Sequence, residues 1–461
     1  MSGEATQSDR NLLIVSNRLP LSIKHSDNGG YETTLSSGGL VSSLSGLSKT
    51  TKFRWFGWPG IEVDESEKGS VRESLASHDA YPVFISNELA DKHYNGFSNS
   101  ILWPILHYQI SSVQFEDSLW DAYREVNSRF AVTVAEEASD GCLIWIHDYH
   151  LTLLPQMLRQ ELAKRGKTAK IGFSLHTAFP ASEVYKMLPV SSEALQGILE
   201  SDLVSFHTDD YVRNFLSACT NILNLKTDGY KIYSNGRTVE VDKFVVGIDP
   251  EKFYSKIKEP QVTKRISEIE EKYKGSTIIS GVDRLDYIKG LPHKLRGFEM
   301  FLQENPELAT KTVLIQVAVP SREDVKEYQQ LESDVSEMVG RINGKYGTTD
   351  HVPIVYLHKS IPIDELAALY AASDVCLLAS TRDGMNLVAF EYVASQRPQH
   401  CGVLVLSEFA GAARFLNGKY QFNPSNLSET SDAIRRAVTA SHEEKLEEIT
   451  KLSKFVKEHT R

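Results

Sequence analysis

Short runs of apolar, mostly β-branched residues recur along the whole chain, and stretches typical of helices lie between most of them. A continuous apolar run suits a strand that is buried on both faces, and strands that alternate with helices are typical of parallel sheets with right-handed crossovers. The pattern therefore predicts an α/β protein. The expected strands are Leu12–Val15, Tyr81–Ser86, Cys142–Leu151, Lys170–His176, Asp202–Thr208, Phe244–Ile248, Thr277–Leu285, Thr312–Val319, Pro353–His358, Asp374–Ser380 and Gly402–Ser407.

The chain is too long for one ordinary core, since its 461 residues fit two domains of common size. The alternating pattern is interrupted at Asp249–Pro260, where two prolines and many charges occur together. We therefore expect two α/β domains of similar size, residues 1–250 and residues 251–461.

Charge and composition exclude several classes of protein. The net charge of -11 argues against a general nucleic-acid-binding surface, so any anionic ligand needs a local cluster of Arg and Lys. The N-terminal segment MSGEATQSDR lacks an apolar signal core, and no apolar stretch is long enough to span a bilayer. The four cysteines form no C-x-x-C pair, which indicates buried, reduced thiols. These features predict a cytoplasmic protein that binds neither nucleic acid nor membranes.

Polar residues follow the apolar runs at the points where the expected strands end. In an open parallel sheet, ligands bind beyond the carboxyl ends of the strands. The residues found there are the first candidates for a site: Asp148, His150, His176, His207, Asp283, Arg284, Arg322, Arg382 and Asp383.

Two segments of the second half could bind phosphate groups. GVDRLDYIKGLPHK places Arg284 and Lys289 on a turn that leaves a strand, where two fixed cations could clamp a diphosphate, although a solvated turn explains the charges as well. STRDGMNLVAFEYVAS runs through a glycine-containing loop into a helix, whose first amides form an anion site. Glu391 in that helix could accept both hydroxyls of a ribose or simply stabilise the helix dipole. Asp383 could equally be a turn former before Gly384.

The segment WIHDYHL raises the question of a metal site. On a continuous strand, Asp148 and His150 would share one face and His147 would lie on the other. Two converging ligands are too few for a closed zinc site. We therefore expect no metal and favour a role in the core or in sugar binding.

Two further segments give weak signals. TLSSGGLVSSLSGL places Gly38 and Gly39 before a helix of small residues, but it lacks both G-x-G-x-x-G and the Walker spacing. HYNGFSNSILWP contains Tyr94 and Trp103, whose aromatic faces could hold a sugar. Core packing explains these two rings at least as well.

Many motifs, read together, resemble one family. In order they are VSNRLP, GGLVSSL, WFGWPG, HYNGFSNSILWP, WIHDYHLTLLP, GFSLHTAFP, VDRLDYIKGLP, GRINGKYG, RDGMNLVAFEYVA and GVLVLSEFAGAA, and they span nearly the whole chain. This set resembles the trehalose-6-phosphate synthase family of the fungal type. The resemblance implies the GT-B architecture, with two Rossmann-like domains and an active site in the interdomain cleft. It also implies a retaining glucosyltransferase that moves glucose from UDP-glucose to glucose 6-phosphate, giving alpha,alpha-trehalose 6-phosphate and UDP.

The resemblance assigns residues to both substrates. Those implied for glucose 6-phosphate are Arg18, Tyr94, Trp103, Asp148 and Arg322, with the two arginines on the phosphate. Those implied for UDP-glucose are Gly38, Gly39, His176, Arg284, Lys289, Ile361, Asp383, Gly384, Met385, Asn386, Leu387, Val388, Ala389, Phe390 and Glu391. Ile361 would meet the uracil through its backbone and Glu391 the ribose. The implied catalytic residues are Arg284, Lys289, His176 and Asp383, of which the last two would hold glucose hydroxyls.

The resemblance also bears on the mechanism. A double displacement needs a carboxylate nucleophile close under the sugar ring, and the resemblance supplies none. It implies front-face substitution, in which the leaving diphosphate accepts the acceptor's proton while Arg284 and Lys289 stabilise the growing charge. No metal and no cofactor are expected.

Partners and alternatives follow from the same comparison. Members of the family usually continue past FVKEHTR into a Trp-containing helix, so a chain that ends at Arg461 is expected to be a shortened synthase without a phosphatase-like extension. The implied partners are a trehalose-6-phosphate phosphatase, regulatory subunits of a trehalose-synthesis complex and further copies of the chain. Two alternatives are an inactive regulatory subunit, against which the presence of all site residues argues, and a transferase for another phosphorylated acceptor.

Overall fold

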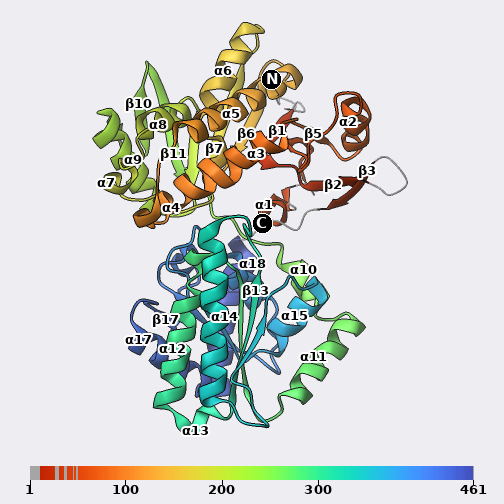
Figure 1. Cartoon of the computed structure of the whole chain (residues 1–461), viewed down its shortest axis with the longest axis vertical. Helices are drawn as coiled ribbons and strands as arrows, with labels where there is room; N and C mark the ends of the chain where they lie inside the picture. The colour runs from red at the N-terminus through yellow and green to blue at the C-terminus, as the bar shows by residue number, and fades with distance from the viewer. Residues whose placement is uncertain (1–10, 26–30, 36–38, 45, 48–49, 460–461) are drawn as a thin grey trace, which may run out of the picture. The chain divides into compact units, whose positions relative to one another are not determined.

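The computed structural model describes residues 11–25, 31–35, 39–44, 46–47 and 50–459. The chain divides into two compact units, Met1–Val245 and Val246–Arg461, each with its own sheet (Figure 1). This boundary lies slightly before the predicted one at residue 250. The predicted roles of the two domains, and the cleft between them, stay predictions.

The first unit is built on a nine-stranded sheet whose core is parallel. Only β10 runs antiparallel to its neighbours β9 and β11. The strand order is β5 (Ala80–Pro82), β4 (Phe53–Trp58), β1 (Leu12–Arg18), β6 (Cys142–His147), β7 (Ala169–Ser174), β8 (Leu203–Phe206), β11 (Arg237–Lys243), β10 (Lys231–Ser234) and β9 (Lys226–Asp228). A separate hairpin pairs β2 (Leu21–His25) with β3 (Tyr31–Leu35).

Helices connect these strands. They are α1 (Gly39–Leu44), α2 (Lys68–Ala76), α3 (Asn87–Asp91), the π-helix η2 (Lys92–Leu102), α4 (Trp103–Leu106), η3 (Ile110–Ser112), α5 (Asp117–Glu137), η4 (Tyr149–Leu151), α6 (Leu154–Lys164), α7 (Ser182–Tyr185), α8 (Ser191–Leu199) and α9 (Asp209–Leu223). Their ends follow ordinary helix chemistry. In α9, the Thr208 side chain accepts a hydrogen bond from the backbone N–H of Tyr211, two aspartates occupy the first turn, and Asn224 ends the helix in the left-handed region.

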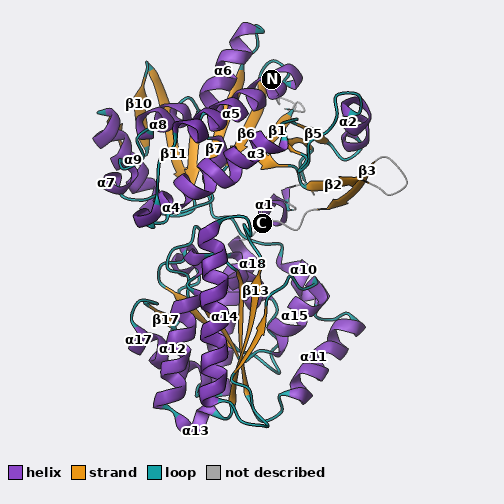
Figure 2. Cartoon of the chain, in the orientation of Figure 1, coloured by secondary structure: helices purple, strands orange, loops and turns teal. Residues whose placement is uncertain are grey.

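The second unit is built on a six-stranded, fully parallel sheet, shown in orange in Figure 2. Its order is β14 (Ile354–Leu357), β13 (Thr312–Val319), β12 (Thr277–Arg284), β15 (Val375–Leu378), β16 (Val403–Ser407) and β17 (Gln421–Phe422). Its helices are α10 (Pro250–Lys256), α11 (Pro260–Lys272), η5 (Tyr287–Lys289), α12 (Leu291–Glu304), α13 (Pro306–Ala309), α14 (Lys326–Tyr346), α15 (Ile363–Ala372), α16 (Leu387–Ala394), η6 (Gly411–Arg414), α17 (Leu427–Val438) and α18 (His442–His459).

Helices cover both faces of this second sheet. In Figure 1, α12 and α14 lie on one side of it, and α11 and α15 lie on the other. Leu295 and Phe298 of α12 and Val335 of α14 pack in one buried cluster with Ile279 of β12 and Leu314 of β13. Burial on both faces explains why these strands are continuous apolar runs in the sequence.

The predicted strands were wrong at several points. Cys142–Leu151 is not one strand, because β6 ends at His147 and the chain turns into η4. Phe244–Ile248 lies outside any strand, at the connection between the two units. The sequence patterns also missed β4 and the β9–β11 ribbon.

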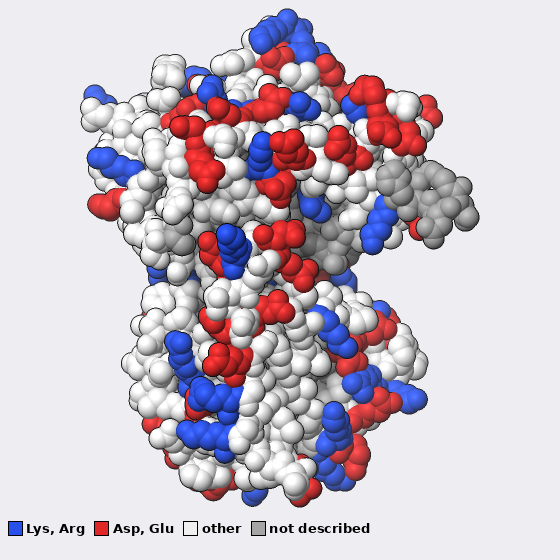
Figure 3. All heavy atoms as spheres, in the orientation of Figure 1, with Lys and Arg blue, Asp and Glu red and all other residues white. Residues whose placement is uncertain are grey.

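Other sequence predictions concern thiols and surface charge. All four cysteines are free and buried, and burial raises the pKa of the Cys376 thiol to about 12. Among the described residues, no helix is both long and apolar enough to cross a membrane. Acidic and basic side chains intermix on the face shown in Figure 3. Candidate anion-binding groups must therefore be sought in local arrangements at the sheet edges.

Candidate functional site

The strand order of the second sheet fixes where a ligand can bind. β12 lies between β13 and β15, and the chain moves outward in one direction from β12 to β14 and in the other from β15 to β17. The order therefore reverses between β12 and β15, and loops leaving such a point open a crevice at the carboxyl ends of the strands. Arg284 ends β12, and Lys289 follows in the next turn. The loop after β15 carries Asp383.

These two loops meet through an ion pair. Lys289 Nζ lies 2.5 Å from Asp383 Oδ2, and the Lys289 side chain is only 13% exposed. The same carboxylate oxygen accepts hydrogen bonds from Ser380 Oγ at 3.2 Å and Asn386 Nδ2 at 3.1 Å. The interpretation of Lys289 as an incidental charge on a solvated turn is therefore wrong. Lys289 is a fixed cation at the switch point of the sheet.

The backbone of the two loops is just as closely fitted. The N–H of Thr381 donates to the carbonyl of Ile288 at 2.8 Å. Gly290 has φ +66°, and a Cβ at this position would lie 2.1 Å from the carbonyl oxygen of Ala379. Only glycine fits this close approach, which brings the Lys289 turn against the loop after β15.

The predicted anion-binding helix begins where the sequence placed it. Asn386 caps α16 in the left-handed region with φ +70°, so the first free amides are those of Leu387, Val388 and Ala389. The side chains of Ala389 and Phe390 are fully buried, which leaves only their main chain for a ligand. Glu391 accepts a hydrogen bond from the Tyr370 hydroxyl at 3.2 Å, and burial raises the pKa of its carboxyl group.

A buried carboxylate joins two of the predicted arginines. Asp286 is fully buried, and its Oδ2 lies 3.3 Å from Arg322 Nη1 and 3.6 Å from Arg284 Nη2. Arg322 has φ +53°, is 3% exposed and also contacts the Tyr328 hydroxyl. The sequence reasoning missed Asp286, although an acid two residues after Arg284 in VDRLDYIKG was a usable signal. Asp286 holds together one arginine predicted for the acceptor and one predicted for the donor.

Asp283 has a different role from the one its position suggested. It forms a buried ion pair with Lys294 of α12, and Gln316 of β13 completes the network with hydrogen bonds to both partners. A Cβ on Gly281 would lie 2.3 Å from the Gln316 amide oxygen. This buried network joins β12, α12 and β13 inside the core.

In the first unit, aromatic rings hold Arg18 at the end of β1. Its guanidinium carbon lies 4.8 Å from the ring centre of Trp58 and 5.7 Å from that of Tyr94. The indole N–H of Trp58 is buried without a hydrogen-bond partner in the part of the chain that the structure describes. A ligand beside Arg18 could accept that hydrogen. Trp58 belongs to the motif WFGWPG, and the residue-level predictions overlooked it.

Tyr94 and Trp103 belong to one cluster of rings. Tyr94 lies on the π-helix η2 and stacks on His150, with 5.5 Å between the two ring centres. The ring centres of His150 and Tyr149 lie 4.0 Å apart. The ring centre of Tyr149 in turn lies 5.4 Å from that of Trp103, and Trp103 is 5% exposed. The structure thus brings Arg18, Tyr94 and Trp103 together, and much of Trp103 is core.

Asp148 lies just past the carboxyl end of β6, next to this cluster. Its φ is +77°, so the strand alternation that placed Asp148 and His150 on one face was wrong. Its Oδ1 accepts a hydrogen bond from the backbone N–H of His176 at 3.2 Å. Within the described ranges, no group of three or more His, Cys, Asp or Glu side chains is arranged so that it could hold a metal ion. Asp148 instead joins the predicted acceptor residues to the predicted donor residue His176.

Backbone strain gathers at these positions. Seven described residues other than glycine have positive φ, and Asp148, Arg322 and Asn386 are three of them. Such conformations are costly for residues with a Cβ and persist where the surrounding structure enforces them, often at functional sites. The other four are Asp79, Tyr108, Asn224 and Asn235, which are not predicted site residues, so strain supports the site only at the three positions named.

Comparisons with known proteins identify the family of the chain. A family model described as glycosyltransferase family 20 matches residues 10–461. A UDP-forming alpha,alpha-trehalose-phosphate synthase 1 of Aspergillus fumigatus is 55% identical over 457 residues, which cover 99% of this chain and 88% of that protein.

The chain belongs to glycosyltransferase family 20.

Solved structures extend this result to the fold. A crystal structure of a UDP-forming alpha,alpha-trehalose-phosphate synthase from Burkholderia xenovorans in complex with glucose-6-phosphate is 32% identical, with a TM-score of 0.86 over 97% of this chain and 96% of that one. A trehalose-6-phosphate structure from E. coli bound with UDP-2-fluoro glucose is 34% identical, with a TM-score of 0.86 over 97% and 95% of the two chains. The predicted family and the predicted GT-B class are confirmed for this member of glycosyltransferase family 20.

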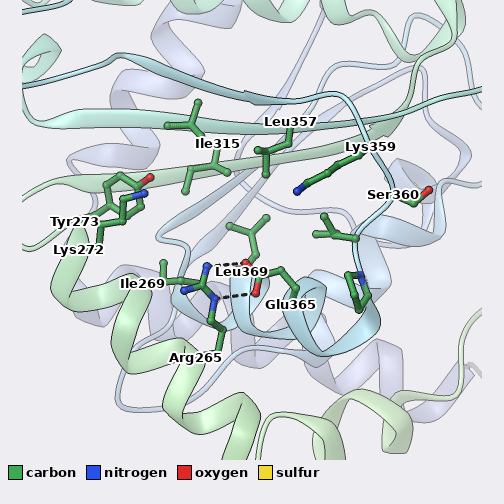
Figure 4. A pocket seen from close by; sticks show the side chains of 13 residues that line it. Arg265, Ile269, Lys272, Tyr273, Ile315, Leu357, Lys359, Ser360, Glu365 and Leu369 are labelled. Carbon is green, nitrogen blue, oxygen red and sulfur yellow. Dashed lines mark hydrogen bonds and ion pairs between the residues drawn. The ribbon is translucent and has the colours of Figure 1, made fainter.

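Three predicted residues of this family 20 chain have no described contact with the clusters above or fall outside the described residues. Gly38 falls outside the described residues, and Gly39 begins α1. Ile361 lines a cavity of about 450 Å³ that Figure 4 shows from close by. In that view Arg265 of α11 makes a double hydrogen bond with Glu365 of α15, at 2.7 and 2.8 Å. The cavity contains no other predicted site residue, so the switch point, and not this cavity, is the better candidate site.

Proposed function

We propose that this chain is a UDP-forming alpha,alpha-trehalose-phosphate synthase, which transfers glucose from UDP-glucose to glucose 6-phosphate. The family and the names of the full-length relatives support this activity. Substrates of this class carry several phosphate groups, and they need fixed cations in a protein of net charge -11. The observation that carries the proposal is the set of such cations at one switch point. Lys289 forms an ion pair with Asp383, and Arg284 and Arg322 both pair with Asp286.

The first unit supplies most of the acceptor residues in this proposal. Arg18 binds the phosphate of glucose 6-phosphate, and Tyr94, Trp103 and Asp148 shape the sugar pocket. We add Trp58 to this set, because its buried indole N–H is available to an acceptor oxygen. Arg322 of the second unit is the other phosphate ligand, since a guanidinium offers paired donors to a phosphate.

The second unit supplies most of the donor residues. Arg284 and Lys289 bind the diphosphate together with the free amides at the start of α16. Glu391 accepts the ribose hydroxyls, and the backbone at Ile361 meets the uracil. Gly38 and Gly39 complete the diphosphate contacts, and His176 and Asp383 hold hydroxyls of the glucose.

The mechanism in this proposal is front-face substitution. The bond between the anomeric carbon and the diphosphate breaks while the acceptor hydroxyl approaches from the same face, and a diphosphate oxygen takes the hydroxyl proton. Arg284 and Lys289 stabilise the charge that grows on the leaving group, and their geometry is set before reaction by Asp286 and Asp383. Lys289, Ser380 and Asn386 all contact Oδ2 of Asp383 and fix its carboxylate, which in this proposal orients the sugar and does not attack it.

The same proposal covers the cellular setting that the family implies. It places the chain in the cytoplasm, with a trehalose-6-phosphate phosphatase, regulatory subunits of a trehalose-synthesis complex and further copies of itself as partners.

A UDP-release assay tests the activity. The purified chain is incubated with UDP-glucose and, in parallel, with glucose 6-phosphate, fructose 6-phosphate, glucose 1-phosphate and glucose. We expect release with glucose 6-phosphate well above the other acceptors, and NMR of the product should show an α,α-1,1 linkage. Equal release with another phosphorylated acceptor would reassign the substrate, and release with none would reject the activity.

A further inference from the structure

Three histidines form a continuous hydrogen-bonded row along the carboxyl edge of the first sheet. They follow or end the neighbouring strands β6, β7 and β8. His147 Nδ1 lies 2.9 Å from His176 Nε2, and His176 Nδ1 lies 3.2 Å from His207 Nε2. The row ends at a backbone group, because His207 Nδ1 lies 3.1 Å from the carbonyl oxygen of Phe244.

The carbonyl of Phe244 sets the direction of every hydrogen bond in this row. A carbonyl oxygen only accepts, so the hydrogen of His207 must be on Nδ1. The Nε2 of neutral His207 is then an acceptor, and His176 must donate to it from Nδ1. The Nε2 of His176 is an acceptor in the same way, and His147 donates to it from Nδ1. All three rings therefore carry their hydrogen on Nδ1.

Burial favours the neutral form of His147 and His176 and disfavours reversal of the row. His147 is fully buried and His207 is 4% exposed. Burial lowers the pKa of His176 to about 4 and that of His147 well below its ordinary value. A reversed row would place a hydrogen on His147 Nε2, which is buried and has no hydrogen-bond partner among the described residues. A buried N–H without an acceptor is costly, so the Nδ1–H arrangement is favoured from both ends.

The middle ring is the one that the proposed function assigns to the donor sugar. Both ring nitrogens of His176 are engaged, so rotation of its imidazole would break two hydrogen bonds. Its backbone N–H is held by the Asp148 carboxylate at 3.2 Å. His176 is thus fixed both at the main chain and at the ring.

We propose that His207 is a positioning residue, which transmits the direction set by the Phe244 carbonyl to His176 and holds its imidazole in one tautomer and one orientation for the donor sugar. His147 occupies Nε2 and Nδ1–H already donates to His207, so His176 can give a hydrogen bond to a ligand only by sharing Nδ1–H with His207. A sugar hydroxyl at this ring therefore accepts a hydrogen bond and does not donate one. This inference rests on the proposed function only for the identity of the ligand.

NMR of histidine tautomers tests the row without any activity measurement. The whole chain, labelled with ¹⁵N at histidine, is examined by long-range ¹H–¹⁵N correlation at neutral pH, and signals are assigned from His147→Gln, His176→Gln and His207→Gln variants. We expect protonated Nδ1 and unprotonated Nε2 in all three rings. His93 is an internal reference of the opposite tautomer, because its Nε2 lies 3.0 Å from the carbonyl oxygen of His150. A hydrogen on Nε2 of any of the three would overturn the row.

Kinetics of two variants test the positioning role. His207→Phe removes the acceptor for His176, and we expect kcat/KM for UDP-glucose to fall about tenfold while KM for glucose 6-phosphate changes less than about twofold. His207→Gln keeps an amide oxygen near the position of Nε2, so it should recover most of the loss. Equal loss in both variants, or none in either, would reduce His207 to a packing residue and reject the proposal. If His207→Phe does not fold, His207→Gln must still retain near-normal kinetics. A wild-type chain that releases no UDP would reject the proposed function but leave the tautomers readable.

Discussion

The carboxyl edges of the two sheets use different chemistry to fix polar groups. At the first sheet, neutral rings are held by other rings and by backbone carbonyls, as in the row from His147 to Phe244. At the second sheet, ion pairs fix the side chains, as in Lys289 with Asp383 and Arg322 with Asp286. The difference matches most of the proposed ligands, because sugar hydroxyls need directed neutral partners and phosphates need charge. Arg18, the proposed phosphate ligand at the end of β1, is the exception. The difference also predicts that the two edges respond differently to charge removal and to acid.

The largest effect is expected inside the second unit, at its fully buried cation. Lys294→Met leaves the Asp283 carboxylate buried without its counter-ion, so the free energy of unfolding should fall by about 3–5 kcal/mol in urea denaturation. The double variant Lys294→Met with Asp283→Leu removes both charges and should recover most of the loss. A single variant as stable as the wild type would break the view that this unit depends on paired charges.

The next effect concerns turnover at the same edge. Lys289→Ala removes one fixed cation from the proposed diphosphate site, and kcat should fall roughly 100-fold, the scale found when one preorganised electrostatic group is deleted. The matched control is Lys274→Ala in the same unit, which removes an exposed lysine paired with Glu271 at 3.3 Å. Full activity of Lys289→Ala together with an unchanged melting temperature would contradict the role of Lys289.

Acid should act on the first unit through its buried histidines. Burial lowers the pKa of His93 and of His176 to about 4, so the unfolded chain binds more protons than the folded chain between about pH 6.5 and pH 4. The stability from each neutral histidine is therefore complete above about pH 6.5 and falls as the pH is lowered toward 4. When the pH is lowered from about 7.5 to about 5, each of these two histidines should lower the free energy of unfolding by roughly 2 kcal/mol.

A single variant isolates one of these histidines. The ring centre of His93 lies 5.3 Å from that of Tyr123, and its Nε2 lies 3.0 Å from the carbonyl oxygen of His150; no charged side chain of the described residues faces it. His93→Phe should lose less stability than the wild type between the two pH values, in urea denaturation followed by circular dichroism. An equal loss of stability in both proteins would show that the burial of neutral His93 does not make the first unit sensitive to acid.

Variants at Arg322 and Asp286 test whether the charged side chains at the edge of the second sheet depend on one another. Arg322→Ala should raise KM for glucose 6-phosphate about tenfold or more and leave KM for UDP-glucose nearly unchanged. Asp286→Asn should raise both by several-fold, because the same carboxylate holds Arg284 and Arg322. Steady-state kinetics with each substrate varied in turn separates the two outcomes. If Asp286→Asn affected only one substrate, the two arginines would be independent.

The smallest effect is expected from chelation. In the proposed site, Arg284 and Lys289 supply the positive charge that a divalent ion supplies in other transferases, so treatment with a chelator should change UDP release by less than about twofold. Activity that disappears with the chelator and returns with a divalent ion would contradict this prediction. It would also return attention to Asp148 and His150 as ligands.

Sequence reasoning reached much of the fold and part of the site. The apolar runs predicted the buried strands of the second sheet because these are enclosed on both faces, whereas β4 and the β9–β11 ribbon mix polar and apolar residues and were missed. Arg284, Lys289 and Asp383 could be named as candidates because Arg284 ends β12 and the other two lie in the segments that follow β12 and β15. Asp286 and Trp58 were overlooked, since their roles depend on contacts with Arg322 and Arg18 that are distant in sequence. The left-handed turn at Asp148 could not be predicted from strand alternation, because tertiary contacts enforce it.

The left-handed backbone of Asp148, Arg322 and Asn386 has a further consequence for attempts to engineer the chain. Each such residue costs on the order of 1 kcal/mol or more, which glycine would largely relieve. A selection for heat resistance alone would therefore accept glycine at these positions and discard the side chains that the proposed reaction needs. Thermostability screens of this protein should hold the three positions constant and look for gains elsewhere, because here resistance to unfolding and catalytic competence compete for the same residues.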